Sequence, residues 1–151
     1  MILFFSLTVL LIIWFIFDSA RALFKNELNE KSILITGCDS GLGNILAKEL
    51  DQKGAQVFAT CLTEDGAQRL KSECSGRMHT IVMDVTDEES VRSAYTYVHR
   101  YTDGIYALVN NAGIAEGLFL ELTSMHKIHR VIEVNLIGVM RVTKLFLPLI
   151  R

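Results

Sequence analysis

The sequence has few cysteines and little net charge, and each of these shortages excludes a class of protein. Its cysteines are Cys38, Cys61 and Cys74, an odd number with no pair in the C-x-x-C spacing of a zinc or redox site. A disulfide framework is therefore not expected, and we interpret the cysteines as free thiols. A formal net charge of −2 over 151 residues provides no basic excess for a nucleic-acid partner.

The sequence also lacks clusters of metal-ligating residues and internal repeats. His126 and His129 are three residues apart and could share a helix face, but no third ligand candidate lies near them, so a solvated pair is favoured over a metal site. The sequence shows no internal repeat and no low-complexity tract. Its length and its 50% hydrophobic content suffice for one domain with a sizeable core.

An apolar segment opens the chain. Residues 2–17, ILFFSLTVLLIIWFIF, would form a helix of about 24 Å at roughly 1.5 Å per residue. We expect residues 1–18 to be a membrane anchor and residues 19–30 a polar linker. A cleaved signal peptide is the second reading, because Ala20-Arg21-Ala22 has the small-x-small form, although no basic region precedes the segment. A buried core helix is least favoured, since the segment has no polar face.

The charges that flank this segment indicate an orientation. Arg21, Lys25 and Lys31 follow the apolar residues, whereas no lysine or arginine precedes them. The positive-inside rule then predicts that the rest of the chain faces the cytosol.

A glycine-rich turn follows the linker. Residues 31–43, KSILITGCDSGLG, read as a short apolar strand, a turn and the start of a helix, with glycines spaced Gly-x-x-x-Gly-x-Gly. Such a turn brings backbone N–H groups and the positive end of a helix toward a phosphate. Glycine is needed where a Cβ would block the turn or the approach of a pyrophosphate. The pattern therefore predicts a dinucleotide site.

Strands and helices alternate from here to the end of the chain. Apolar runs predict strands, and apolar periodicity predicts helices, at residues 32–36, 41–53, 56–61, 63–74, 80–83, 87–101, 105–109 and 124–146. On the first helix we expect Leu42, Ile45, Leu46 and Leu50 to face the core. Fully apolar strands joined by helices predict an α/β fold, the N-terminal part of a doubly wound, Rossmann-like parallel sheet with strand order 3-2-1-4. Residues 31–151 would form an incomplete dinucleotide-binding domain.

Four short strings, taken together, point to a family. They are Thr36-Gly37-x-x-x-Gly41-x-Gly43, Asp84-Val85, Asn110-Asn111-Ala112-Gly113, and Asn135 within VNLIGV. This set resembles the short-chain dehydrogenase/reductase family. The string TGCDSGLG, the string ATCLTE at residues 59–64 and the apolar N-terminus resemble its membrane-associated retinol and hydroxysteroid dehydrogenase branch. That branch oxidises or reduces retinoid and steroid alcohols with a nicotinamide cofactor.

The resemblance assigns roles to the first turn. It implies that the pyrophosphate is bound by Gly37, Ser40, Gly41, Leu42 and Gly43. A merely tight strand–helix turn is the alternative reading of these glycines.

It also assigns roles at the ends of strands three and four. Asp84 would accept a hydrogen bond from the adenine amino group, and Val85 would pack against the ring. Beside the cofactor ribose would lie Asn111, Ala112 and Gly113, while Asn110 would tie neighbouring strands together. Turn formation is the alternative role for these Asp and Asn residues.

Asn135 matches the asparagine that, in the family, supports a water chain to the catalytic lysine. It falls on an apolar stripe made by Ile128, Val131, Ile132, Val139, Val142 and Phe146. We therefore expect a buried amide with hydrogen-bond partners.

The residues near strand two favour NAD over NADP. Cys61 holds the place where an acidic residue would bond the ribose 2′-OH, and Glu64 and Asp65 lie just beyond it. No lysine or arginine occurs at residues 38–40 or 59–63, so a 2′-phosphate would lack a cation and lie near Asp39.

The family's tyrosine–lysine pair does not occur in this sequence. Four residues after the tyrosines stand His99, Tyr101, Ile105 and Asn110, none of them lysine. The resemblance places the serine, tyrosine and lysine after the helix that contains Asn135. We therefore expect an N-terminal portion that is catalytically incomplete alone. The alternative is a non-catalytic, membrane-anchored fragment or truncated isoform with a binding or regulatory role. Other expected partners are a hydrophobic alcohol for the full-length form, the endoplasmic reticulum membrane and a second copy of the chain.

Overall fold

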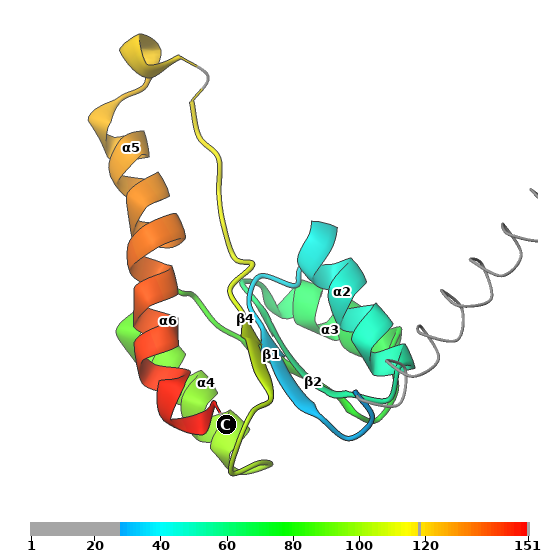
Figure 1. Cartoon of the computed structure of the whole chain (residues 1–151). Coiled ribbons are helices and arrows are strands. Elements are labelled where there is room, and N and C mark those ends of the chain that lie inside the picture. The colour runs from blue at the N-terminus through cyan, green and yellow to red at the C-terminus, as the bar shows by residue number, and fades with distance from the viewer. Residues whose placement is uncertain (1–27, 118, 151) are drawn as a thin grey trace, which may run out of the picture.

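The computed structural model describes residues 28–117 and 119–150. Its strands are β1 (Ser32–Ile35), β2 (Gln56–Cys61), β3 (Met78–Val82) and β4 (Ala107–Val109). They form one parallel sheet in the order β3-β2-β1-β4, which confirms the predicted α/β class and strand order. Figure 1 shows this sheet between its helices.

The proposed membrane anchor at residues 1–18 and nearly all of the linker lie outside the described residues. Within the part of the chain that the structure describes, no helix is long and apolar enough to cross a membrane.

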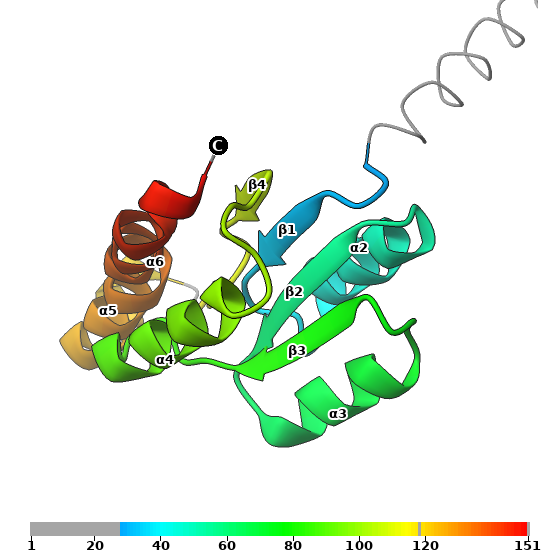
Figure 2. The same ribbon diagram turned by 90° about the horizontal axis from the view of Figure 1, so that it is seen from below.

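Helices cover both faces of the sheet. They are α2 (Gly41–Gln52), α3 (Glu64–Ser72), α4 (Glu88–His99), α5 (Met125–Ile132) and α6 (Val139–Phe146), with short 3-10 turns η1 (Leu120–Leu122) and η3 (Leu147–Leu149). A π-helical turn, η2 (Glu133–Gly138), joins α5 to α6, so the predicted helix over 124–146 is one helical run. Figure 2 shows α2 and α3 on one face and α4 with α6 on the other.

Alternation along the strands explains the two cores. Ile33 and Ile35 of β1 face one side of the sheet and join the core under α2 and α3. Leu34 of β1 and Phe58 of β2 face the opposite side and pack with residues of α4 and α6. Because every residue of a central parallel strand contacts one of these layers, the strands are apolar on both faces.

The inward face predicted for α2 was right for Leu46 and Leu50, which pack in the core, but wrong for Leu42 and Ile45. Leu42 is 79% exposed and Ile45 is 58% exposed, whereas the buried side of the helix carries Gly43, Ala47 and Leu50. Small residues lie against the sheet because α2 approaches it closely: a Cβ on Gly43 would stand 2.4 Å from the Asn111 side-chain nitrogen. The large apolar residues of the first turn therefore face away from the core.

The long helical run packs on the sheet only through its C-terminal part. Val142 and Phe146 are fully buried, while α5 contains no buried residue and Ile132 is 45% exposed. Figure 1 shows the reason, since α5 extends beyond the edge of the sheet beside the extended chain that follows β4. The apolar stripe predicted for this helix is thus a core stripe only in α6.

Phe146 supplies a stability test. Its ring is fully buried and meets the Tyr95 ring edge-on at 5.4 Å between centroids. We expect Phe146→Ala to lower the free energy of unfolding by about 3–5 kcal/mol, through lost burial and a residual cavity. Leu147→Ala is the matched control: Leu147 is 60% exposed, and we expect a change within about 0.5 kcal/mol. Urea unfolding followed by circular dichroism measures both, and equal losses would contradict this packing.

Candidate functional site

A cavity of about 650 Å³ lies at the carboxyl ends of the four strands, where open α/β sheets bind their ligands. Residues that directly follow each strand contribute to its lining, and α5 with η2 closes one side. Of the predicted site residues, the cavity is lined by Gly37, Ser40, Leu42, Asp84, Val85, Asn111, Ala112 and Gly113. The structure therefore brings together three strings that lie far apart in the sequence.

The glycine turn is shaped by close packing as well as by its backbone angles. Gly37 has φ +71°, and a Cβ there would stand 2.7 Å from the Cα of Ala112. A Cβ on Gly43 would stand 2.5 Å from the Gly37 carbonyl oxygen. Gly41 differs, because its φ is +63° but no atom of the described residues lies within 4 Å of the point where its Cβ would stand. The turn is therefore tightly packed on one side and open at Gly41, where α2 begins.

A hydrogen-bonded clamp joins the ends of β1 and β4. The Thr36 hydroxyl accepts bonds from the backbone N–H groups of Asn111 and Ala112, both at 3.0 Å. In return the Asn111 amide donates to the carbonyl oxygens of Thr36 and Gly37, both at 2.9 Å. We predicted that Asn110 ties the strands, but Asn110 donates to Thr143 of α6 at 3.0 Å. Asn111 performs that task, because its side chain points toward β1.

Asp39, and not Cys61, brings a side chain to the cavity beside the end of β2. Its carboxylate accepts bonds from the N–H groups of Leu62 and Thr63 and from the Thr63 hydroxyl, at 2.7–3.0 Å. Burial raises the pKa of Asp39, but these hydrogen bonds outweigh burial and hold its pKa below the usual value. Asp39 and Leu62 both line the cavity. A carboxylate beside the end of β2 therefore comes from the glycine turn rather than from β2 itself.

Cys61 does not reach the cavity. Its side chain is fully buried in the core under α2 and α3, and burial raises the pKa of its thiol to about 12. Cys38 is buried in the same core, its N–H donates to the Thr60 carbonyl at 2.8 Å, and burial also raises its thiol pKa. Both thiols act as small apolar side chains beneath the turn.

Asp84 has the turn role, and its predicted role in binding adenine stays a prediction. One carboxylate oxygen, Oδ1, accepts from both the N–H and the hydroxyl of Thr86 at 2.8 Å, and the Asp84 N–H donates to Ser90 at 2.9 Å. No bond to the second oxygen, Oδ2, is formed by the described residues. The loop is thus held by its own turn while one acceptor stays available.

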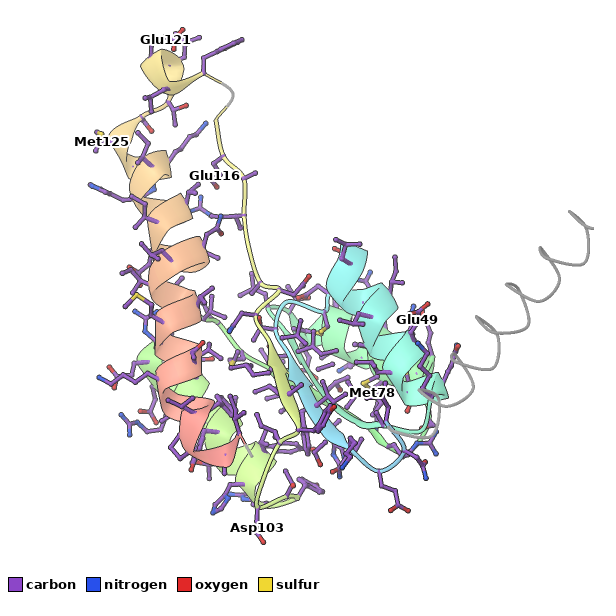
Figure 3. The ribbon with its side chains drawn as sticks, viewed as in Figure 1. Glu49, Met78, Asp103, Glu116, Glu121 and Met125 are labelled. Atoms are coloured by element: carbon purple, nitrogen blue, oxygen red, sulfur yellow. The ribbon has the colours of Figure 1, made fainter. Side chains whose placement is uncertain are left out.

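Asn135 is exposed, so its predicted burial was wrong, but its predicted partners are present. Its amide oxygen accepts from the Ile114 N–H at 2.9 Å and its amide nitrogen donates to the Ile114 carbonyl at 2.8 Å. Among the described residues of η2 only Gly138 is buried, and the extended chain that follows β4 runs beside this part of the helical run (Figure 1). Arg130 forms an ion pair with Glu116 of the same segment, at 2.9 Å. Figure 3 shows Glu116 on this extended segment, beside the helical run.

The cavity lining carries more acidic than basic side chains. Its acidic lining residues are Asp39, Asp84 and Glu133, and Arg130 is the one basic residue in the lining given by the described chain. Sequence reasoning missed Arg130 and Glu133, which stand three residues apart on the same helical run as Asn135. An anionic group would meet backbone N–H groups at the α2 end and the guanidinium on α5.

The model of the family described as short chain dehydrogenase matches residues 31–151. The chain is 42% identical over 128 residues to retinol dehydrogenase 7 of Mus musculus, and 44% identical over 129 residues to 17-beta-hydroxysteroid dehydrogenase type 6 of Homo sapiens. These alignments cover 83% of this chain but only 40% and 41% of those proteins. The chain thus spans less than half the length of these relatives.

Solved structures share the fold. A 3-ketoacyl-(acyl-carrier-protein) reductase from Brucella melitensis, complexed with NADH, superposes with a TM-score of 0.76 at 31% identity, covering 81% of this chain and 51% of that chain. A second short-chain dehydrogenase/reductase from the same organism gives a TM-score of 0.77 at 26% identity, covering 82% of this chain and 54% of that one.

The clamp at Thr36 yields a test with an internal control. Thr36→Val keeps the shape of a side chain that is 1% exposed but leaves two N–H groups without an acceptor. We expect unfolding free energy to fall by about 2–3 kcal/mol. Thr60 on β2 is equally buried, and its hydroxyl has no partner among the described residues. Thr60→Val should therefore be neutral or stabilising by about 1 kcal/mol. Denaturant titration compares the two, and a reversed order would refute the clamp.

Proposed function

Since the chain belongs to the short chain dehydrogenase family, we propose that it forms the nucleotide-binding half of an NAD-preferring oxidoreductase that acts on retinoid or steroid alcohols and the corresponding carbonyls. The observation that carries this proposal is one cavity that joins the glycine turn, Asp84 and the Asn111–Gly113 string. The relatives named retinol dehydrogenase and 17-beta-hydroxysteroid dehydrogenase support the substrate class.

The residues around the cavity fit such a cofactor. The open space at Gly41, next to the N-terminus of α2, suits a pyrophosphate that accepts from backbone N–H groups. Asp84 Oδ2 would accept from the adenine amino group, with Val85 against the ring. Asn111, Ala112 and Gly113 would lie beside the cofactor ribose. When bound, the nicotinamide supplies the acceptor or donor of a hydride.

Asp39 supports NAD over NADP. Its lowered pKa keeps the carboxylate ionised at neutral pH, and it lies beside the end of β2, where the adenosine ribose is bound in this fold class. A 2′-phosphate there would face a negative charge, and like charges 4 Å apart repel by about 1–4 kcal/mol, depending on solvent exposure.

These 151 residues bind the cofactor, in our proposal, without oxidising an alcohol by themselves. A tyrosine of ordinary pKa near 10 is a poor base at neutral pH unless a nearby cation lowers that pKa. None of the four tyrosines is followed by a lysine at the fourth position, and Tyr97, which lies beside Tyr101, has its pKa raised by burial to about 12. A raised pKa disfavours the phenolate that would act as the base, so Tyr97 is not activated for this role.

Fluorescence titration of the purified 151-residue chain tests this function. We expect NADH to bind at least tenfold more tightly than NADPH, and Asp39→Asn to reduce this preference because it removes the repelling charge. Glu64→Gln is the matched control, since Glu64 begins α3 and does not line the cavity. No binding of NADH would sink the proposed function, and turnover of a retinoid or steroid alcohol by the same sample would contradict the proposed incompleteness.

We also propose that residues 1–18 anchor the chain in the endoplasmic reticulum membrane with residues 31–151 on the cytosolic side. The apolar composition of residues 2–17 and the three basic residues after them support this placement. The full chain expressed in cells should remain with membranes after alkaline carbonate extraction, and a chain beginning at residue 28 should be released. Full protection of residues 31–151 from protease added to intact microsomes would contradict the cytosolic orientation.

A further inference from the structure

Arg141 on α6 binds two residues that line the cavity, although its own side chain lies outside the lining. Its guanidinium donates through Nη1 to the backbone carbonyl of Val85, at 2.5 Å, and through Nη2 to the carboxylate of Glu133, at 2.7 Å. Val85 and Glu133 line the cavity, whereas Arg141 does not. The arginine side chain is only 22% exposed, so both bonds are partly shielded from water.

Val85 is fixed from a second side by the same helical run. Gly138 is buried against it, and a Cβ on Gly138 would stand 2.8 Å from the Val85 Cγ2 atom. The loop between β3 and α4 therefore contacts the helical run through both the side chain and the carbonyl of Val85. Its neighbour Asp84 is held only by bonds within the loop and to the start of α4.

The π-helical turn separates Arg141 from its ion-pair partner Glu133 along the helical run. Glu133 begins this turn and Arg141 follows it, eight residues later. In a regular α-helix, residues eight apart are separated by about 12 Å along the axis, so the ion pair needs an extended arginine that spans the turn. π-helical turns are frequent at functional sites. Here the turn, the arginine and the loop form one connected unit.

We propose that Arg141 is a positioning residue for the adenine end of the dinucleotide site, and this inference rests on the proposed function. By holding the Val85 carbonyl it fixes the loop that presents the Asp84 carboxylate. By pairing with Glu133 it neutralises a carboxylate that lines a cavity for an anionic ligand. Loss of Arg141 would free the loop and leave that negative charge uncompensated.

Adenosine monophosphate is the probe for this role, because it carries the adenine end of the cofactor without the nicotinamide. We expect Arg141→Met in the full 151-residue chain to weaken its binding about tenfold, the effect of losing charge-assisted hydrogen bonds. Arg141→Lys retains the charge but cannot serve two partners with the same geometry, so its affinity should lie between those of wild type and Arg141→Met. Isothermal titration calorimetry measures the three affinities.

A charge-specific rescue separates this role from a merely structural one. Adding Glu133→Gln to Arg141→Met removes the uncompensated carboxylate, so the double variant should recover part of the lost affinity. Arg92→Met is the matched control: Arg92 also pairs with a carboxylate, Glu88 at 2.9 Å on α4, but it does not line the cavity or contact Val85. Its affinity should equal that of wild type.

The outcomes are distinguishable. If wild type binds neither adenosine monophosphate nor NADH, the proposed function fails, and this inference fails with it. If wild type binds and Arg141→Met binds equally well, or the double variant recovers nothing, the positioning role alone is overturned. Should Arg141→Met not fold, Arg141→Lys decides, because unchanged affinity in that variant would overturn the role.

Discussion

The hydroxyl of Thr36 is the contact on which the site depends. It accepts hydrogen bonds from the backbone N–H groups of Asn111 and Ala112. These bonds hold the end of β4 against the end of β1. The Asn111 amide completes the exchange by binding the two carbonyls at the start of the glycine turn. With these bonds in place, Gly37 and Gly43 must lie where a side chain would collide with the β4 segment or with the turn. The position of α2, and of its N-terminal N–H groups, follows from this packing.

The arrangement of the sheet could be predicted from the sequence because several independent signals agree. Short apolar runs mark the strands, helical spacing marks the connections, and right-handed crossovers leave few strand orders. Only part of the buried face of α2, Leu46 and Leu50, could be predicted in this way. Periodicity assigns large apolar residues to the core, whereas α2 lies so close to the sheet that Gly43 and Ala47 take those positions. The close approach is a tertiary constraint imposed by residues about 70 positions away.

Motifs located most of the cavity but not the pairings that shape it. The glycine turn, Asp84 and the Asn111–Gly113 string are local sequence motifs that can be recognised without a structure. They line one cavity. Asp39 binds residues 23 and 24 positions away, and Arg141 binds a carbonyl 56 positions away. Pairings at such separations leave no local pattern in a single sequence. Asn135 was assigned to the core because its stripe is apolar, although the helical run packs on the sheet only after Asn135, in α6.

The two thiols beneath the glycine turn have a consequence for chemical labelling. Burial raises the pKa of the Cys61 thiol, so little of the reactive thiolate forms at neutral pH. Neither thiol is exposed, so an electrophile meets them only when the layer under α2 and α3 separates from the sheet. The rate at which these cysteines are alkylated therefore reports how often that layer opens. A ligand that stabilises the glycine turn would lower the alkylation rate of both cysteines without contacting either sulfur atom.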